Sequence, residues 1–357
     1  MTELLRVPPT AVSVHPAVVS AARALRRGRL VAFPTETVYG LGANGLDPDA
    51  VGRIFAAKGR PPDNPLILHV ESLAAAEELV AEMPTVARRL AEAFWPGPLT
   101  MVLRRRACVP DVVSAGLPTV AVRVPAHPVA LSLIRAAGVP VAAPSANKSG
   151  KPSPTTAAHV MADLDGLVDV VLDSGPTAVG LESTVIDLSL ASPRLLRPGG
   201  VTFEDLTSVL GRGVLELAGE GEAERPAAPG MKYRHYAPAA PLTVVTGHPA
   251  EVASIIRAEM RAAGSAGRRL AALVFSETVP LIPAGGLVLD LGSRSRPEMA
   301  GRRLFAHLRA CDQERVDGIL VEGTTEEGMG RAVMNRLLKA AGGRVLRAGE
   351  GKACVDG

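Results

Sequence analysis

Aromatic side chains are scarce in this 357-residue chain and make up only 3% of it. A protein that binds single-stranded nucleic acid by base stacking needs exposed rings, so this scarcity argues against that function. The formal net charge is +3, which is too small to indicate a surface for duplex nucleic acid. It still allows a local site for an anionic ligand.

Cysteine is also rare, since Cys108, Cys311 and Cys354 lie far apart and no Cys-x-x-Cys pair occurs. The sequence therefore supports neither a disulfide framework nor a cysteine-rich zinc site. The N-terminal stretch lacks the apolar core of a secretory signal, and no apolar run is long enough to cross a membrane. With 47% hydrophobic and 21% charged residues, the chain is expected to be a globular protein of the cytoplasm that does not associate with membranes.

Composition divides the chain into three parts. Residues 1–212 mix strand and helix patterns. Residues 213–240 are rich in glycine, proline and charge and sustain no period, which predicts a linker, although they end in the aromatic and basic cluster MKYRHYAP. Residues 241–357 alternate strand and helix, which predicts a parallel sheet covered by helices on both faces.

Hydrophobic periodicity locates the expected elements. In the first part we expect helices at 15–27 and 48–58, a helical pattern over 71–94 broken at Pro84, and strands at 30–33, 65–70, 99–103, 119–124, 141–143, 170–172 and 184–188. In the third part we expect strands at 242–245, 270–275, 287–291 and 318–321, with helices at about 250–263, 297–310 and 328–341. The whole pattern is that of an α/β protein.

The stretch FPTETVYGLG, residues 33–42, leaves a buried strand through Thr35, Glu36 and Thr37 in place of a plain turn. One interpretation is a strand end that caps the next element. The other is a binding site at the carboxyl end of the strand, where ligands of open α/β sheets collect.

Two cations, Lys58 and Arg60, follow a predicted helix in the stretch KGRPPDNP. A glycine separates them and prolines stiffen the loop. Such a loop can hold both toward a polyphosphate, because arginine binds two oxygens and lysine acts as a point charge. An ordinary C-terminal helix cap explains the two cations equally well.

Two polar residues interrupt apolar strands. Because burying an unpaired guanidinium is costly, Arg123 in TVAVRVP must face a rim or an anion. The strand pattern fits an arginine whose guanidinium binds a small carboxylate through two nitrogens. It fits equally an arginine on an edge strand whose side chain reaches solvent. His69 in PLILHV lies on the face opposite Leu66, Leu68 and Val70, and a lone strand histidine is more often structural than catalytic.

Three polar turns complete the set. PSANKSG, residues 144–150, brings hydroxyl, amide and amine donors to a strand end, as a phosphate or magnesium–phosphate cradle does, but its composition also suits an ordinary loop. GLEST (180–184) and LRPGG (196–200) are, in isolation, polar turns. Because so many cations and hydroxyls fall at strand ends of one α/β unit, the sequence favours a site for an anionic ligand.

In this order, FPTETVYGLG, KGRPPDNPLILH, TVAVRVP, PSANKSG, LESTVID, LRPGG and KYRHYAP resemble the L-threonylcarbamoyladenylate synthase family, the YrdC-domain family, in its two-domain form. The resemblance is highly specific from about residue 14 to 240 and looser beyond. It implies an open, twisted mixed sheet with helices in the first part and a smaller parallel, Rossmann-like α/β domain in the third. The linker, 213–240, is expected to fold over the active site.

The resemblance also implies a nucleotidyltransferase that converts ATP, L-threonine and bicarbonate into threonylcarbamoyl-AMP, pyrophosphate and water. Mg²⁺ is expected to arrive with ATP and to be held mainly by its phosphates, not by protein side chains. The product would pass to a tRNA threonylcarbamoyl transferase complex, which modifies the adenosine beside the anticodon. A weak direct contact with tRNA is a further expectation.

Roles for individual residues follow from the same resemblance. Those implied to be catalytic are Lys58, Arg60, Ser145 and Asn147. Those implied to bind L-threonine are Thr37, His69, Arg123, Ala143 and Ser183. Those implied to bind ATP are Lys58, Arg60, Asn64, Thr119, Ser145, Ser153, Arg197 and, reaching back from the linker, Tyr236.

Two other functions fit part of this pattern. An RNA-binding module is one, but the modest net charge and the scarce aromatics disfavour it. Carbamoyl transfer in hydrogenase maturation is the other, because a similar domain occurs there. Those proteins resemble this chain only in part, since they also carry an acylphosphatase-like domain and cysteine zinc motifs that this sequence lacks.

Overall fold

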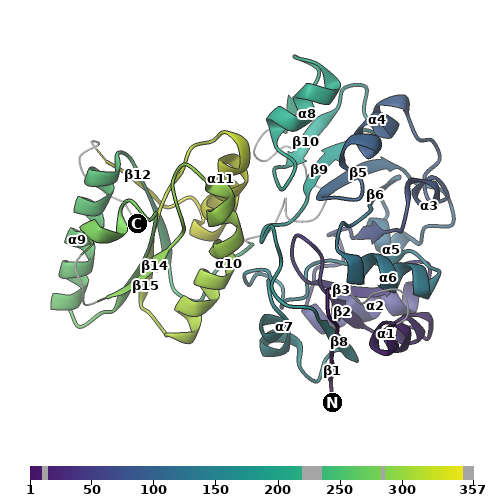
Figure 1. Ribbon diagram of the computed structural model, residues 1–357, viewed down its shortest axis with the longest axis horizontal. Coiled ribbons are helices and arrows are strands. Elements are labelled where there is room, and N and C mark those ends of the chain that lie inside the picture. The colour runs from purple at the N-terminus through teal and green to yellow at the C-terminus, as the bar shows by residue number, and fades with distance from the viewer. Residues whose placement is uncertain (10–14, 219–234, 283–285, 349–357) are drawn as a thin grey trace. The chain divides into compact units, whose positions relative to one another are not determined.

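The computed structural model describes residues 1–9, 15–218, 235–282 and 286–348. The chain forms two compact units, drawn from purple to teal and from green to yellow in Figure 1. The first comprises Met1–Ser149 and Ser153–Tyr233, and the second comprises Gly150–Pro152 and Arg234–Gly357. None of the helices in the described part of the chain has the length and apolar character needed to span a bilayer.

The first unit is built on an 11-stranded mixed sheet with the order β1-β8-β2-β3-β7-β4-β6-β5-β9-β10-β11. Its strands are β1 (Glu3–Arg6), β2 (Val31–Phe33), β3 (Gly40–Asn44), β4 (Ile67–His69), β5 (Leu99–Arg104), β6 (Thr119–Arg123), β7 (Val141–Ala142), β8 (Val170–Asp173), β9 (Thr184–Asp187), β10 (Arg194–Arg197) and β11 (Glu216–Leu217). Its helices are α1 (Pro16–Arg26), α2 (Pro48–Lys58), α3 (Leu73–Glu77), α4 (Thr85–Phe94), α5 (Asp111–Ser114), α6 (Pro128–Ala137), α7 (Ala157–Leu164) and α8 (Phe203–Leu210).

The predicted helix at 48–58 and the helical pattern over 71–94 are confirmed. The α2 helix begins after Asp47, whose carboxylate accepts hydrogen bonds from the first-turn amides, and has proline at its first position. It ends at Gly59, whose φ of 61° is the left-handed conformation that glycine adopts readily. The helical pattern over 71–94 forms two helices, α3 and α4, separated at Pro84 as expected.

Strand β3, by contrast, was not predicted. Its sequence GLGAN contains two glycines, which are depleted in strands. The structure shows why one of them is needed: a Cβ on Gly42 would lie 2.8 Å from the Phe33 ring and 2.8 Å from the Val141 side chain. Close packing between neighbouring strands, which sequence periodicity does not report, therefore selects glycine here.

The middle of this sheet has one face in the main core and one polar face. Along β6, Val120 and Val122 belong to the main core, so Thr119, Ala121 and Arg123 alternate onto the other face. The core side is covered by α2, α4, α5 and α7. The other side holds a small apolar cluster of Ile67, Val102, Ala121 and Val185, with Leu196 packed against it.

The register of the strands sets which polar residues share that second face. In the parallel β4–β6 pair, Ile67 lies opposite Ala121 and His69 lies opposite Arg123. In the antiparallel β5–β6 pair, Val102 lies opposite Ala121, so Thr100 is on the same face. We refer to this surface as the polar sheet face; its polar residues are His69, Thr100, Thr119, Arg123 and Ser183.

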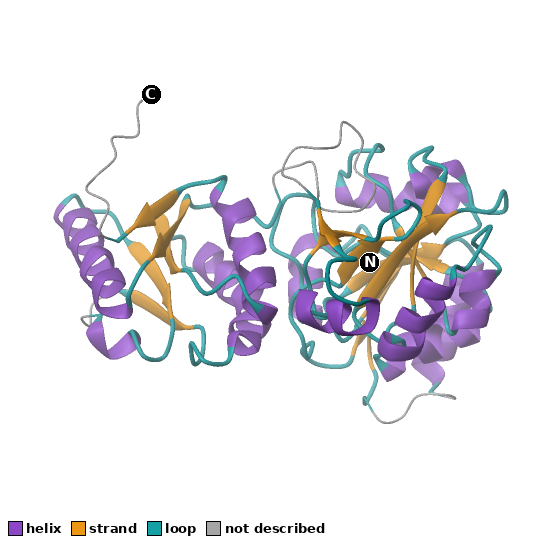
Figure 2. Ribbon diagram, turned by 90° about the horizontal axis from the view of Figure 1, so that it is seen from above, coloured by secondary structure: helices purple, strands orange, loops and turns teal. Residues whose placement is uncertain are grey.

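The second unit is a five-stranded sheet in which every neighbouring pair is parallel, in the order β14-β13-β15-β12-β16. Its elements are β12 (Leu242–Thr246), α9 (Pro249–Ser265), β13 (Leu270–Val274), the short 3₁₀ helix η1 (Val279–Leu281), β14 (Leu287–Asp290), α10 (Pro297–Gln313), β15 (Gly318–Glu322), α11 (Gly328–Ala341) and β16 (Val345–Arg347). Figures 1 and 2 show α9 on one face of this sheet and α10 and α11 on the other. The predicted parallel sheet covered on both faces is thus confirmed.

Tyr236 belongs to the second unit, where its ring is buried. Only 4% of the residue is exposed. The ring stacks on Phe305 of α10 with centroids 5.3 Å apart, and the guanidinium carbon of Arg336 lies 5.4 Å from its centroid. The preceding part of the predicted MKYRHYAP cluster, up to residue 234, lies outside the described residues. The expected reach of Tyr236 over a nucleotide stays a prediction.

The short segment Gly150–Pro152 is also part of the second unit. The amide of Ala237 donates a 2.9 Å hydrogen bond to the Gly150 carbonyl. The buried side chain of Arg309, on α10, donates a 2.5 Å hydrogen bond to the Pro152 carbonyl. The segment Gly150–Pro152 is therefore held within the second unit by two hydrogen bonds.

A buried carboxylate organises the end of the parallel sheet. Glu322, the last residue of β15, is fully buried. It accepts hydrogen bonds from the Phe275 amide at 2.8 Å and the Thr278 hydroxyl at 2.9 Å, and it forms an ion pair with Arg294. These contacts tie the loops that follow β13 and β14 to β15. Both of its oxygens are thus satisfied, which is the condition for burying a carboxylate.

We therefore expect Glu322→Ala to lower the free energy of unfolding by about 3 kcal/mol, because it leaves a buried amide, a hydroxyl and a guanidinium without their acceptor. Urea unfolding measures this change. The matched control is Glu314→Ala, which removes the exposed ion pair with Arg269 and should cost less than about 1 kcal/mol. Equal effects of the two substitutions would contradict a structural role for the buried carboxylate.

Candidate functional site

Arg123 is the centre of a buried cluster on the polar sheet face. Only 3% of the residue is exposed, and β6 lies between β4 and β5, so the interpretation as an edge-strand arginine in solvent is wrong. Its Nε donates to the Gly97 carbonyl at 3.2 Å, one terminal nitrogen donates to Thr37 Oγ1 at 3.0 Å, and the other forms a 2.6 Å ion pair with Glu36 Oε1. The guanidinium meets an anion, as its burial requires.

The loop after β2 is shaped by its own threonines. The Thr35 hydroxyl donates to the Val38 carbonyl at 2.6 Å and accepts the Thr37 amide at 3.2 Å. It also lies 2.8 Å from Thr37 Oγ1. A hydroxyl that bonds backbone two and three residues ahead stabilises a tight turn. This local pattern is why the strand ends in Thr-Glu-Thr: the first threonine folds the loop and presents the next two residues to Arg123.

His69 lies on the same face and is neutral. The imidazole is buried, and its Nδ1 has no hydrogen-bond partner in the described part of the chain. Burial, reinforced by the charge of the neighbouring Arg123, lowers the pKa of His69 from 6.5 to about 3. The edge of its ring meets Phe33 at a centroid distance of 6.2 Å. At neutral pH it therefore offers a neutral ring beside the guanidinium.

Ser183 links the polar face to Arg197. Its hydroxyl lies 2.8 Å from Thr100 Oγ1 on β5. Arg197 Nε donates to the Ser183 carbonyl at 3.1 Å, and an Arg197 terminal nitrogen donates to Ser183 Oγ at 3.2 Å. All three residues are buried. A second guanidinium is thus held rigidly at the edge of the same face.

Lys58 forms a second cationic cluster with the loop after β7. Its ammonium donates to the carbonyls of Ser145 and Asn147, each at 2.5 Å. The residue is 3% exposed and ends α2, so the helix aims it at another loop. The amide of Ser149 donates back to the Lys58 carbonyl at 3.0 Å, which closes the contact.

Arg60 and Asn64 fold the loop that follows. Arg60 Nε donates to the Asn64 carbonyl at 3.1 Å, and one terminal nitrogen donates to the Pro65 carbonyl at 2.9 Å. Both side chains are buried, and Asn64 Oδ1 has no hydrogen-bond partner among the residues that the structure describes. A buried amide oxygen without a donor is unusual in proteins and marks a position where a ligand donor or a cation fits.

Backbone hydrogen bonds join these clusters through the loop after β2. The Gly180 amide donates to Thr37 at 3.0 Å, and the Ala146 amide donates to Tyr39 at 2.8 Å. Tyr39 in turn donates to Pro154 at 2.9 Å. The segments that carry Ser145, Asn147, Ser153 and Ser183 are therefore attached to one stretch, residues 34–41.

The remaining predicted residues are placed as follows. Ser153 is buried and donates a 2.5 Å hydrogen bond to Glu182 Oε1. The backbone of Ala143 donates to the Ile67 carbonyl at 2.9 Å, at the start of β4. Thr119 is half-buried at the start of β6, on the polar face. Tyr236 alone among the predicted site residues belongs to the second unit.

Two family models match the chain. One described as telomere recombination matches residues 23–199, and one described as the C-terminal domain of threonylcarbamoyl-AMP synthase matches residues 201–342. The threonylcarbamoyl-AMP synthase of Bacillus subtilis is 47% identical over 336 residues, covering 93% of this chain and 95% of that protein. The protein of the same name from Pyrococcus abyssi is 49% identical over 332 residues, covering 92% and 94%.

The chain belongs to the threonylcarbamoyl-AMP synthase family. The crystal structure of Pyrococcus abyssi Sua5 complexed with L-threonine agrees, with a TM-score of 0.90 at 45% identity over 97% of this chain and 99% of that one. The chain is accordingly an enzyme, a nucleotidyltransferase that forms threonylcarbamoyl-AMP.

Some partners of the site were not predicted from the sequence. Glu36, Thr100 and Glu182 each contact a predicted residue, yet none was assigned a role. Thr100 could have been singled out, since it is a polar residue within the apolar strand at 99–103, as Arg123 is within its own strand. Glu36 and Glu182 sit in loops, where no period indicates the direction of a side chain. Only the folded chain shows what they contact.

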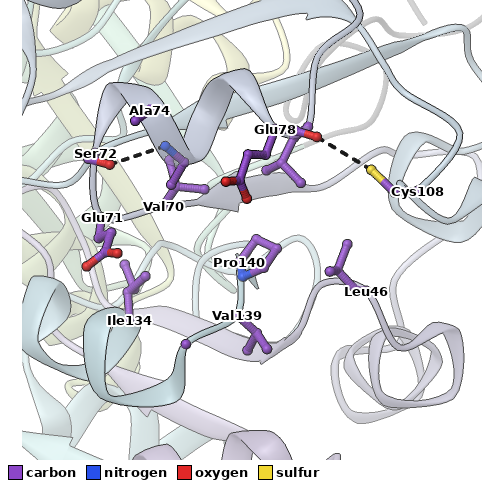
Figure 3. Close-up of a pocket in the computed structure, with 13 residues that line it drawn as sticks. Leu46, Val70, Glu71, Ser72, Ala74, Glu78, Cys108, Ile134, Val139 and Pro140 are labelled. Carbon is purple, nitrogen blue, oxygen red and sulfur yellow. Dashed lines mark hydrogen bonds between the residues drawn. The ribbon is translucent and has the colours of Figure 1, made fainter.

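A cavity of about 470 Å³ beside α3 is separate from these residues (Figure 3). Its lining is mainly apolar, with Glu71 and Glu78 at the wall, and includes none of the predicted site residues. Figure 3 shows the Cys108 thiol directed at the Glu78 carbonyl, 3.7 Å away. This cavity is therefore not part of the candidate site.

The neutral state of His69 has a consequence for stability. Because its folded-state pKa is depressed, the unfolded chain binds a proton that the folded chain does not, so stability is lost as the pH falls from about 6.5 toward 3. At pH 5 the loss relative to pH 7.5 should be about 2 kcal/mol larger in the natural protein than in His69→Gln. Urea unfolding of both proteins at the two pH values checks this. Equal losses would contradict a buried neutral imidazole.

Proposed function

We propose that this enzyme forms threonylcarbamoyl-AMP at the polar sheet face, with L-threonine at the Arg123 cluster and ATP at the Lys58 cluster. The observation that carries the proposal is the pair of buried cations, Arg123 and Lys58. The loops that they contact, after β2 and after β7, are joined by a backbone hydrogen bond. The L-threonine complex of Pyrococcus abyssi Sua5, a protein 45% identical to this chain, supports the threonine assignment.

In this proposal Arg123 binds the carboxylate of L-threonine. A guanidinium pairs with a carboxylate through two parallel hydrogen bonds, and burial strengthens the pairing. Thr37 and Ser183 lie beside Arg123 and Arg197 and supply hydroxyls that give or accept hydrogen bonds. The neutral ring of His69 adds contact surface without a competing positive charge.

Lys58 and Arg60 are proposed to bind the triphosphate of ATP, together with Asn64, Ser145, Asn147 and Ser153. Thr119 and Arg197 are proposed to complete the nucleotide site. The Lys58 ammonium is already fixed by two carbonyls, so little reorganisation is needed when an anionic ligand approaches. Each of these roles stays a prediction for this chain.

Mg²⁺ is proposed to enter with ATP. No cluster of three or more His, Cys, Asp or Glu side chains able to hold a metal occurs among the described residues. Mg²⁺ prefers oxygen ligands and is commonly held by substrate phosphates with few protein groups. The buried amide oxygen of Asn64 is an oxygen ligand of the kind that Mg²⁺ prefers, and it would add one side-chain ligand that the sequence did not lead us to expect. Bound there, the ion would neutralise charge on the pyrophosphate.

The chemistry then requires little covalent help from the protein. The threonine amine captures CO₂ or bicarbonate as a carbamate, whose oxygen attacks the α-phosphorus of ATP, and the bond to pyrophosphate breaks. Buried cations that hold both substrates in place lower the barrier by positioning and by charge stabilisation. The tRNA threonylcarbamoyl transferase complex that would take the product, and a weak contact with tRNA, stay predictions.

The reaction is tested by measuring pyrophosphate release from ATP and Mg²⁺ with and without L-threonine and bicarbonate. We expect release that requires both. Pyrophosphate release that does not depend on threonine, from protein shown to be folded and to bind ATP, would overturn the assignment of the Arg123 cluster. Salt-sensitive tRNA binding without turnover would favour the RNA-binding alternative.

We expect Lys58→Ala and Arg60→Ala each to lower turnover roughly a hundred- to thousandfold, because each removes about 3–4 kcal/mol of transition-state stabilisation. The same pyrophosphate assay measures the loss. Arg53→Ala, which removes an exposed cation from the same helix, is the matched control and should leave the rate unchanged. Near-normal rates in both site variants would refute the phosphate assignment.

A further inference from the structure

Glu36 carries a buried oxygen that nothing in the described part of the chain satisfies. Its side chain is 12% exposed. Oε1 accepts a hydrogen bond from Arg123 at 2.6 Å, whereas Oε2 is buried and has no partner among the described residues. A carboxylate oxygen that has left water without gaining a donor destabilises the protein, so such a group calls for an explanation.

The surrounding residues do not supply a second cation for this carboxylate. Arg123 is the one cation within ion-pair distance of Glu36 among the described residues. His127 is close enough for the Glu36 charge to raise its pKa, but burial lowers that pKa more, so its ring is neutral near pH 7. The Glu36 carbonyl is occupied separately by the Val179 amide at 2.8 Å. Within the described part of the chain no residue supplies the missing donor, and a bound ligand can supply it.

The geometry points to a role in substrate recognition: we infer that Glu36 binds the α-ammonium group of the amino acid substrate. This inference rests on the proposed function, in which Arg123 binds the substrate carboxylate. In an α-amino acid the carboxylate and the ammonium are attached to the same carbon. A substrate held by the Arg123 guanidinium therefore brings its ammonium next to a carboxylate that contacts the same guanidinium.

The chemistry of the two groups is complementary. An ammonium has three donors and no acceptor, and the free Glu36 oxygen is an acceptor with no donor. Arg123 and Glu36 together form an opposite-charge pair that matches a zwitterion, with one charge of the pair for each charge of the ligand. A buried site of this kind discriminates strongly against an analogue that lacks one of the groups, because its own charge is then left unpaired.

A second explanation must be separated from this one. Glu36 could merely neutralise Arg123 in the free enzyme and leave when the substrate carboxylate arrives. In that case removal of the Glu36 carboxylate would strengthen the binding of every carboxylate ligand, whether or not the ligand carries an ammonium. The two explanations thus differ in the sign of the effect on L-threonine.

The test measures binding by calorimetry in the absence of ATP, using the full chain and its Glu36→Gln variant. The two probes are L-threonine and 2,3-dihydroxybutanoate of the same configuration, in which a hydroxyl replaces the ammonium. We expect Glu36→Gln to weaken the binding of L-threonine roughly ten- to a hundredfold. The affinity for the dihydroxy acid should be unchanged or higher. Glu71→Gln, which removes an exposed carboxylate ion-paired with Arg135, is the matched control and should change neither.

Other outcomes overturn the inference. If the substitution weakens the binding of both probes equally, Glu36 only orients Arg123. If it strengthens the binding of both, Glu36 is only a counter-ion of Arg123. Failure of the natural protein to bind L-threonine refutes the threonine site itself, which distinguishes that failure from a wrong role for Glu36. Glu36→Asp keeps the charge and should keep the preference for L-threonine, so a loss of that preference also rejects the inference, even if Glu36→Gln does not fold.

Discussion

A guanidinium buried inside a sheet must find partners within the protein, and the site is organised around that requirement. Strand β6 has neighbours on both sides, so Arg123 cannot reach solvent along the sheet edge. Its three nitrogens are satisfied by Gly97, Thr37 and Glu36. Two of these lie in the loop after β2, which is thereby fixed over the polar sheet face and in turn anchors the segments that end β7 and precede β9.

The same rule applies to the other buried cations of the first unit. Lys58 and Arg60 are bound by main-chain carbonyls, and Arg197 by Ser183. Arg123 has a carboxylate partner, Glu36, and it is the residue for which a zwitterionic ligand is proposed.

Much of the fold follows from local signals. Caps and apolar periods predicted the α2 helix almost to the residue, the break at Pro84, and the alternating strands and helices of the second unit. Prediction failed where strand identity depends on packing, as at β3, where Phe33 and Val141 leave no room for a Cβ on Gly42. Strand order is likewise non-local, since residues 70–118 lie between the paired strands β4 and β6.

The sequence by itself determined which residues alternate onto one face and which cations stand at strand ends, because those facts depend on a period of two and on position in the chain. It also identified the family through ordered motifs. Only the tertiary structure decided that Arg123 lies inside the sheet, that Glu36 is its counter-ion and that Lys58 holds the loop after β7. Such pairings join residues far apart in sequence, and the direction of a loop side chain is set by its contacts and not by any repeat.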